Sequence, residues 1–195
     1  MYAKEITNEQ VNELPLLKFN GRSKVISSKN DVRNAIAEMS DQSFVGFDTE
    51  TKPNFIKGNI NEVALIQLAA GNQAYLIKIN KTGLTEDIVD FFESDIPKIG
   101  IALHDDIKGL QRLRNFVPNS FINANKVTLE MGITNQGIRK LAGIILGGRV
   151  SKSQQLSNWE SPEFTKAQIT YAATDAWVCW KMYKELLSQG HISIN

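Results

Sequence analysis

The stretch from Phe44 to Glu50 constrains the fold of this chain more than any other. It reads Phe-Val-Gly-Phe-Asp-Thr-Glu, an apolar run of strand-forming residues that ends in two carboxylates. Residues i and i+2 of a strand point to the same face, so Asp48 and Glu50 are expected to face one spot. Like charges held close together raise each other's pKa, and a divalent cation would relieve that repulsion. Such triplets also begin solvated turns by chance, so the interpretation needs support from the rest of the chain.

Length and composition are those of an ordinary globular protein. The chain has 195 residues, of which 42% are hydrophobic and 22% charged, enough apolar material for a substantial core. Its formal net charge is +1, so phosphate binding would need a local patch or metal ions. We expect a single domain over residues 1–195, with residues 1–22 forming a surface arm.

Cysteine content and hydropathy bear on the location of the protein. Cys179 is the single cysteine, which excludes an intrachain disulfide and indicates a buried thiol. The first ten residues lack the apolar core of a signal peptide, and no apolar run approaches the roughly 18 residues of a membrane span. The sequence predicts a cytoplasmic or otherwise intracellular protein with no membrane partner.

The order of the expected elements indicates an α/β fold. Strands are expected at 24–26, 44–50, 63–70, 74–79, 99–103 and 121–122. Helices are expected near 32–39, 85–92, 105–114, 125–131, 135–146 and 165–187, with Thr85 and Thr165 as N-caps and Gly147 at a C-cap. A strand followed by a helix, twice over, favours a sheet that ends in parallel order.

Two further acidic sites form a set with Asp48 and Glu50. Asp106 lies where an apolar strand gives way to a helix, although aspartate also commonly caps helices there. Tyr171 and Asp175 lie four residues apart in the last helix and share a face. Strand ends and the helices that cross them meet at one crevice of an α/β sheet, so we expect these side chains to converge.

Four converging carboxylates are an all-oxygen ligand set, which suits magnesium or manganese rather than zinc. Two such ions about 4 Å apart can activate a water on one side of a phosphorus atom and stabilise the leaving oxygen on the other. No nucleophilic side chain is needed, and His104 and His191 form no convincing Ser-His-Asp or Cys-His arrangement. The residues therefore indicate a two-metal phosphodiesterase.

The same residues carry a resemblance to a known family. Three segments resemble the motifs of the DEDDy 3'-5' exonucleases: Phe-Asp-Thr-Glu with Asp48 and Glu50, Ile-Gly-Ile-Ala-Leu-His-Asp-Asp with Asp106, and Tyr-Ala-Ala-Thr-Asp-Ala with Tyr171 and Asp175. Val-Ala-Leu-Ile-Gln-Leu at 63–68 and Ser-Asn-Trp at 157–159 are similar to the branch of ribonuclease D and the exonuclease domain of the Werner syndrome helicase. The likeness covers roughly residues 24–187, with the motifs in the right order.

The resemblance implies a ribonuclease H-like fold, with a mixed sheet of about five strands flanked by α-helices. It implies that Asp48, Glu50 and Asp175 ligate the metal that carries the attacking water. Asp48 would bridge to a second metal, which Asp106 would hold largely through waters, and Tyr171 would orient the nucleophilic water. The implied reaction is hydrolysis of DNA or RNA from a free 3' end with two Mg²⁺ or Mn²⁺ ions, releasing nucleoside 5'-monophosphates.

One segment departs from the family pattern. Many relatives carry an Asp-Leu pair where this chain reads Phe121-Ile122-Asn123-Ala124. The segment lies outside the carboxylate set, so we expect a difference in local packing rather than in catalysis. The chain stops soon after the last helix, without an accessory nucleic-acid-binding domain, so we expect targeting to come from a partner protein or from the catalytic domain itself.

A phosphate backbone needs cations beyond the metals. Lys52 and Arg149 are the preferred candidates from a set in the loop after the first motif or around the loop before the last helix: Lys52, Lys57, Arg139, Lys140, Arg149 and Lys152. Phe55 either stacks on the terminal base or anchors its loop. His104 is expected to be structural, and so are the tryptophans Trp159, Trp177 and Trp180.

Two other functions fit the same fold. A noncatalytic module would bind nucleic acid or a protein partner, and it would typically lack one of the carboxylates, none of which is missing here. An endonuclease would cut closed circular single strands, on which an exonuclease cannot start. The sequence does not decide between RNA and DNA, and it predicts no oligomeric state.

Overall fold

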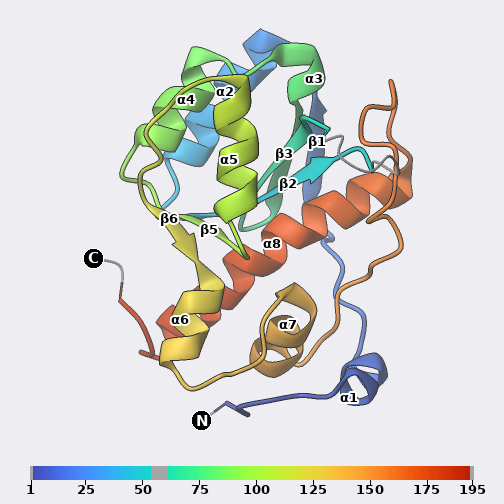
Figure 1. Cartoon of the computed structure of the whole chain (residues 1–195), viewed down its shortest axis with the longest axis vertical. Coiled ribbons are helices and arrows are strands. Elements are labelled where there is room, and N and C mark those ends of the chain that lie inside the picture. The colour runs from blue at the N-terminus through green and yellow to red at the C-terminus, as the bar shows by residue number, and fades with distance from the viewer. Residues whose placement is uncertain (1, 54–60, 194–195) are drawn as a thin grey trace.

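The computed structural model describes residues 2–53 and 61–193 (Figure 1). Within these residues one sheet contains six strands: β1 (Arg22–Ile26), β2 (Val45–Thr51), β3 (Val63–Ala70), β4 (Gln73–Lys78), β5 (Lys98–Gly100) and β6 (Phe121–Asn123). The helices are α1 (Asn8–Glu13), α2 (Lys29–Ser40), α3 (Ile79–Thr82), α4 (Glu86–Glu93), α5 (His104–Leu113), α6 (Ala124–Glu130), α7 (Ile138–Leu146) and α8 (Lys166–Ser188).

The sheet mixes antiparallel and parallel pairs in the order β1-β4-β3-β2-β5-β6. The central strands β2, β3 and β4 form an antiparallel meander, whereas β1 runs parallel to β4, and β5 and β6 continue parallel to β2. This confirms the predicted mixed α/β sheet flanked by helices. The sheet has six strands rather than about five, because the three-residue strand β6 pairs with β5 at one edge.

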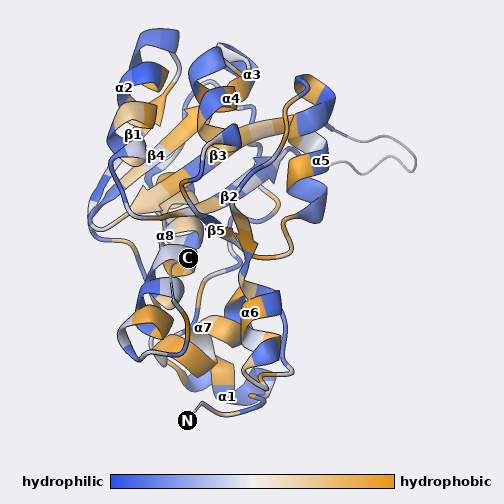
Figure 2. Ribbon diagram, turned by 90° about the vertical axis from the view of Figure 1, so that its left-hand side faces the viewer, coloured by the Kyte–Doolittle hydropathy of each residue, from blue (hydrophilic) through white to orange (hydrophobic). Residues whose placement is uncertain are grey.

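Helices cover both faces of the sheet. The long helix α8 crosses one face, while α2, α4 and α5 lie on the other, and α1, α6 and α7 gather together at the lower end of the molecule (Figures 1 and 2). The alternation of strand side chains explains this division. Ile66 and Leu68 belong to the core cluster shared with α2 and α4, whereas Leu65 and Ala69 pack with the alanines of α8. The two apolar faces of one sheet thus support two helical layers.

Small residues let α8 approach β2 closely. A Cβ atom added at Gly46 would lie 1.9 Å from the carbonyl oxygen of Ala176. Ala172, Ala173 and Ala176 of α8 are fully buried in the same layer. The close approach sets the depth at which the side chains of α8 meet those that follow Gly46 on β2.

The turn between β5 and α5 is tighter than the sequence predicts. We expected a strand over 99–103, but β5 ends at Gly100, and Ala102 adopts a left-handed conformation with φ of 54°. The Asn123 side chain accepts hydrogen bonds from the Ala102 amide (3.3 Å) and from the Asn125 amide (3.1 Å). Asn123, in the segment that departs from the family pattern, therefore caps α6 and holds this turn, a local packing role.

The arm expected over residues 1–22 contains a helix that the sequence analysis did not predict. Thr7 and Gln10 form a capping box at the start of α1, and Val11 is 1% exposed. The Phe19 amide donates a hydrogen bond to the Thr174 hydroxyl of α8 at 3.0 Å. The arm is thus tied to the last helix.

In the described part of the chain, no helix combines the length and hydrophobicity that a membrane span requires.

The predicted helix ends agree with the structure at two places. Thr165 caps α8 and forms a capping box with Gln168. Gly147 ends α7 in the left-handed conformation, with φ of 61°. Cys179, predicted as a buried thiol, is 1% exposed.

Candidate active site

Strand β2 carries two acids to the face covered by α8. Phe47 packs in the opposite layer, with α2 and α4, so its neighbours in sequence, Asp48 and Glu50, face α8. The antiparallel register places Asp48 opposite Gln67 and Glu50 opposite Leu65. The pairing shifts just after Glu50, so the regular sheet ends where the two carboxylates lie.

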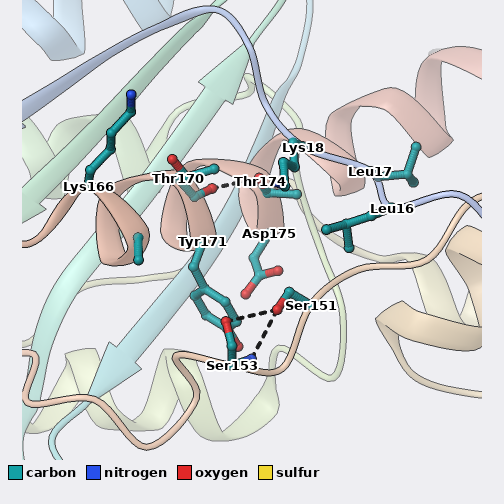
Figure 3. Close-up of a pocket in the computed structure, with 11 residues that line it drawn as sticks. Leu16, Leu17, Lys18, Ser151, Ser153, Lys166, Thr170, Tyr171, Thr174 and Asp175 are labelled. Atoms are coloured by element: carbon teal, nitrogen blue, oxygen red, sulfur yellow. Dashed lines mark hydrogen bonds between the residues drawn. The ribbon is translucent and has the colours of Figure 1, made fainter. Parts of the chain in front are cut away.

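Helix α8 supplies the second pair of polar side chains. Tyr171 and Asp175 lie one turn apart on one face of the helix and point to the same side (Figure 3). Asp175 is only 5% exposed. The close packing of α8 on Gly46 sets this pair beside β2, near enough for the charges of Glu50 and Asp48 to act on Tyr171.

Asp106 joins the set from the first turn of α5. Its carboxylate accepts a hydrogen bond from the hydroxyl of Thr49, the residue between the two acids of β2. The neighbouring Asp105 is exposed, whereas Asp106 is half-buried. The structure thus separates the two adjacent aspartates, and it is Asp106 that is tied to β2.

Burial raises the pKa of all four carboxylates, and the charges of other acids in the set raise those of Asp48 and Glu50 further. Burial raises the pKa of Asp48 well above its ordinary value, and the charges of Asp175, Asp106 and Glu50 raise it further. Burial and the charges of Asp175 and Asp106 raise the pKa of Glu50 to about 9. Burial raises the pKa of Asp175 to about 7 and also raises that of Asp106. The four acids therefore share one electrostatic environment that lacks a compensating cation among the residues responsible for these shifts.

The donor chemistry of this site fits a hard divalent cation. Carboxylate oxygens are the ligands that Mg²⁺ and Mn²⁺ prefer, and a cation would reverse the repulsion that raises these pKa values. As the side chains stand, no three Asp, Glu, His or Cys residues in 2–53 and 61–193 are arranged to hold a metal ion. Asp106 is bonded to Thr49 instead, and a cation would draw the carboxylates closer.

Tyr171 lies deeper than an ordinary surface tyrosine. Burial, followed by the charges of Asp175 and Glu50, raises its pKa far above the usual value. The ring centroid of the fully buried Trp159 lies 6.0 Å from that of Tyr171. Trp159, expected in the core, thus packs against the ring of Tyr171. The phenol is protonated at any physiological pH.

Two hollows adjoin the acidic set. One, of about 390 Å³, is lined by Tyr171 and Asp175 together with Ser151 and Ser153 (Figure 3). The other, of about 340 Å³, is lined by Glu50, Asp106, Lys52 and Arg112 among others. The acids therefore lie between two open spaces on the surface.

The predicted substrate contacts Lys52 and Arg149 both have protein partners. Lys52 forms an exposed ion pair with Glu160 at 3.0 Å. The Nε atom of Arg149 donates to the Leu14 carbonyl at 3.1 Å, so Arg149 holds the arm against the loop before α8. Their contact with a substrate stays a prediction. Two other candidates, Phe55 and Lys57, lie outside the described residues.

Three residues of this site were not assigned to it from the sequence: Thr49, Gln67 and Trp159. Gln67 is fully buried on β3, and neither its side-chain oxygen nor its nitrogen has a hydrogen-bond partner within the described structure. Its signal in the sequence is one polar residue within the apolar run 63–70. Thr49 left no such signal, because its partner Asp106 is 57 residues away.

Comparisons with known proteins give the family. Residues 23–191 match the family model described as 3'-5' exonuclease. The chain belongs to the DEDDy 3'-5' exonuclease family. A relative, the exonuclease mut-7 homolog of Aedes aegypti, is 27% identical over 200 residues, which cover 88% of this chain and 27% of that protein.

Two solved structures share the ribonuclease H-like fold. The EXO domain of Aedes aegypti Nibbler has a TM-score of 0.80 at 24% identity, covering 89% of this chain and 92% of that one. Escherichia coli RNase D, described as an exoribonuclease involved in structured RNA processing, has a TM-score of 0.75 at 19% identity, covering 87% and 46%. The exonuclease domain of this family therefore accounts for most of the chain.

Proposed function

We propose that this protein is an active metal-dependent 3'-5' exonuclease, which removes nucleoside 5'-monophosphates from the 3' end of DNA or RNA. The observation that carries the proposal is the convergence of Asp48, Glu50, Asp106 and Asp175 with Tyr171. The raised pKa values of these acids, which burial causes in all four and neighbouring charges increase in Asp48 and Glu50, support it. Such a set of acids destabilises the folded protein unless cations neutralise it. Membership of a 3'-5' exonuclease family supports a catalytic reason for keeping the set.

Each side chain has a part in this proposal. Asp48, Glu50 and Asp175 would hold one divalent ion, with Asp48 shared by a second ion near Asp106. Bound Mg²⁺ or Mn²⁺ would supply an activated water and charge stabilisation for the leaving oxygen. Thr49 positions Asp106 through its hydrogen bond.

Tyr171 acts in this proposal as a hydrogen-bond donor and acceptor that orients the attacking water. Burial raises the pKa of the phenol in the metal-free site, which suits orientation of the water better than proton abstraction. The buried Trp159 fixes the ring. Lys52, Arg149 and Phe55 are the side chains that the sequence predicts to contact the strand.

The test uses 5'-labelled single-stranded DNA, its RNA counterpart and a recessed-3' duplex, each with Mn²⁺ or Mg²⁺. Wild-type protein should yield a ladder that shortens from the 3' end. EDTA and Asp48→Asn should both abolish it, whereas Asp90→Asn, which changes an exposed acid on α4, should leave it intact. Full activity of Asp48→Asn would disprove the assignment of this site.

One observation favours the alternative of a noncatalytic module, since no three acids of the described residues are arranged to hold a metal ion. Tight binding of nucleic acid without cleavage in either metal would support that alternative. Cleavage of a closed circular single strand would indicate an endonuclease. The cytoplasmic location and the targeting partner stay predictions from the sequence.

A further inference from the structure

Beside the acidic set, one more stripe of α8 faces the arm. Thr170, Thr174, Trp177 and Lys181 are spaced by four, three and four residues, so they share one face of the helix. The arm crosses this face, where the Phe19 amide bonds to the Thr174 hydroxyl. Helix and arm together bound two hollows that meet at Lys18, on either side of this hydrogen bond. We call the pair the arm groove, and its lining includes Leu16, Lys18, Arg22, Thr170, Trp177 and Lys181.

The arm groove is continuous with the candidate active site. The hollow that contains Tyr171 and Asp175 is also lined by Leu16 and Lys18 (Figure 3). A second hollow, of about 650 Å³, begins at Lys18 and extends to the far side of the arm. Ten residues of helix separate Tyr171 from Lys181 in sequence, or about 15 Å along the axis. A polynucleotide that leaves the acids on this side would pass over the arm at the exposed Lys18 to reach the second hollow.

The far part of the groove carries uncompensated positive charge. Lys18, Arg22 and Lys181 line the second hollow, and no carboxylate does. Within the described residues none of these three cations forms an ion pair. In a chain whose net charge is only +1, this is a local positive patch, which is what a phosphate backbone requires.

Apolar surface lies beside these cations. Leu16 is 37% exposed, and Trp177 is half-buried, with its ring 5.9 Å from that of Phe19. The Lys181 ammonium lies 4.6 Å from the centroid of the Trp177 ring. Aromatic and apolar platforms next to cations suit unpaired bases, which stack without regard to sequence.

We propose that the arm groove binds the single-stranded part of a polynucleotide whose 3' end lies at the acidic set. Lys18, Arg22 and Lys181 contact its phosphates, while Leu16 and Trp177 contact its bases. The charge complementarity and the continuity with Tyr171 and Asp175 favour this ligand over a protein segment. The proposal rests on the proposed function and adds to it a site for the strand upstream of the cleaved bond.

The experiment compares the double variant Lys18→Ala/Lys181→Ala with the control Lys29→Ala/Lys126→Ala, which removes two exposed lysines outside the groove. The readout is the ratio of kcat/KM for a 12-nucleotide single strand to kcat/KM for a dinucleotide. We expect this ratio to fall about tenfold in the groove variant and to match wild type in the control. The salt dependence of KM for the long strand should weaken only in the groove variant.

If the two double variants had the same ratio of kcat/KM values and the same salt dependence of KM, the proposal that the arm groove binds the strand would be wrong. A wild-type protein that cleaves neither substrate would overturn the proposed function instead. In that case, binding of a labelled 12-nucleotide strand to the groove is measured by fluorescence anisotropy in the presence of EDTA. Weaker binding and a lower salt slope in the groove variant alone would still support it, and identical binding by all three proteins would reject it. Thermal unfolding confirms that each variant is folded.

Discussion

Among single residues, Gln67 is a buried amide for which the described structure offers no partner. It is fully buried on β3, directly opposite Asp48, and residues opposite each other in an antiparallel pair share a face of the sheet. Leaving such an amide unsatisfied costs about 1 to 3 kcal/mol. We expect the amide to be retained because it positions the charged Asp48 carboxylate when the site holds its metal ions.

Gln67→Met tests this positioning role, because methionine keeps the volume and removes the amide. We expect the unfolding temperature to stay level or rise, while kcat falls about tenfold or more. Thermal denaturation and steady-state hydrolysis of a labelled strand give the two readouts. Gln42→Met, an exposed control in the segment between α2 and β2, should change neither. A Gln67→Met protein that is less stable but fully active would assign Gln67 a structural role only.

Tyr171 permits a second prediction at this scale. Burial and the charges of Asp175 and Glu50 raise its pKa far above the usual value in the metal-free protein, so the phenol is available there as a protonated hydrogen-bonding group. Tyr171→Phe removes the hydroxyl and should lower kcat on the order of 100-fold, with a much smaller change in KM. Steady-state hydrolysis of the 12-nucleotide strand over a range of concentrations measures both parameters. Undiminished kcat would show that the water is oriented by another group.

Four of the five proposed catalytic side chains pair by a local rule, whereas Asp106 was placed with them from its position between a strand and a helix and from the family resemblance. Asp48 and Glu50 obey strand alternation, and Tyr171 and Asp175 obey the helical repeat. Gln67 and Thr49 become part of the site only through pairings between distant segments. Sequence spacing carries no record of such pairings, which is why neither residue was assigned to the site beforehand.

At the scale of elements, the segment between α7 and α8 is held from below by a buried lysine. Lys78, at the end of β4, is 1% exposed. Its ammonium donates to the carbonyls of Ser161 and Pro162, and it lies 4.5 Å from the centroid of the Phe164 ring. The segment that carries Trp159 is thereby fixed to the sheet beneath Tyr171.

Lys78→Met should therefore lower the free energy of unfolding by about 1 to 3 kcal/mol, because two backbone carbonyls lose their donor. It should also lower activity, since the support of Tyr171 loosens. Urea denaturation at pH 7 measures the first effect and hydrolysis the second. Lys81→Met, which changes an exposed lysine on α3, is the matched control. Equal stability of the two variants would contradict the role given to Lys78.

Elements with strong local signals were predicted well, and the others were not. Thr165 with Gln168 and the left-handed Gly147 mark helix ends by local hydrogen bonding. Helix α1 has only six residues and one buried side chain, Val11, which packs against α7, so its periodicity is too short to read. The early end of β5 depends on Asn123 of another strand, a contact that no local pattern encodes.

On the scale of the whole molecule, the acidic set links stability to pH and to divalent ions. Burial and neighbouring charges raise the pKa of Glu50 to about 9, and burial raises that of Asp175 to about 7. Both values exceed those of an unfolded chain, near 4, so the folded protein without metal binds more protons than the unfolded one. The stabilising contribution of these two groups is greatest below pH 4, and it is lost as the pH rises toward 9.

One buried cation changes stability in the opposite direction, at higher pH. Lys98 is fully buried, and burial lowers its pKa to about 8. Its folded pKa is below that of an unfolded lysine, near 10.4, so this group favours the folded state increasingly as pH rises from about 8 to 10.4. A scan between pH 5 and pH 8 therefore reports mainly on the carboxylates.

We expect the unfolding temperature of the protein in EDTA to fall between pH 5 and pH 8. Mg²⁺ or Mn²⁺ should raise it, and by more at pH 8 than at pH 5, because ligands must lose their protons to bind a metal. Glu50→Gln should flatten the pH dependence in EDTA and reduce the metal-induced rise, whereas Glu38→Gln, on the opposite layer, should retain the metal-induced rise. Differential scanning calorimetry measures both effects. A metal-induced rise that was the same at both pH values, or that Glu50→Gln left in full, would show that the ions bind elsewhere. Only carboxylates that exchange protons for metal make the effect of the ions depend on pH.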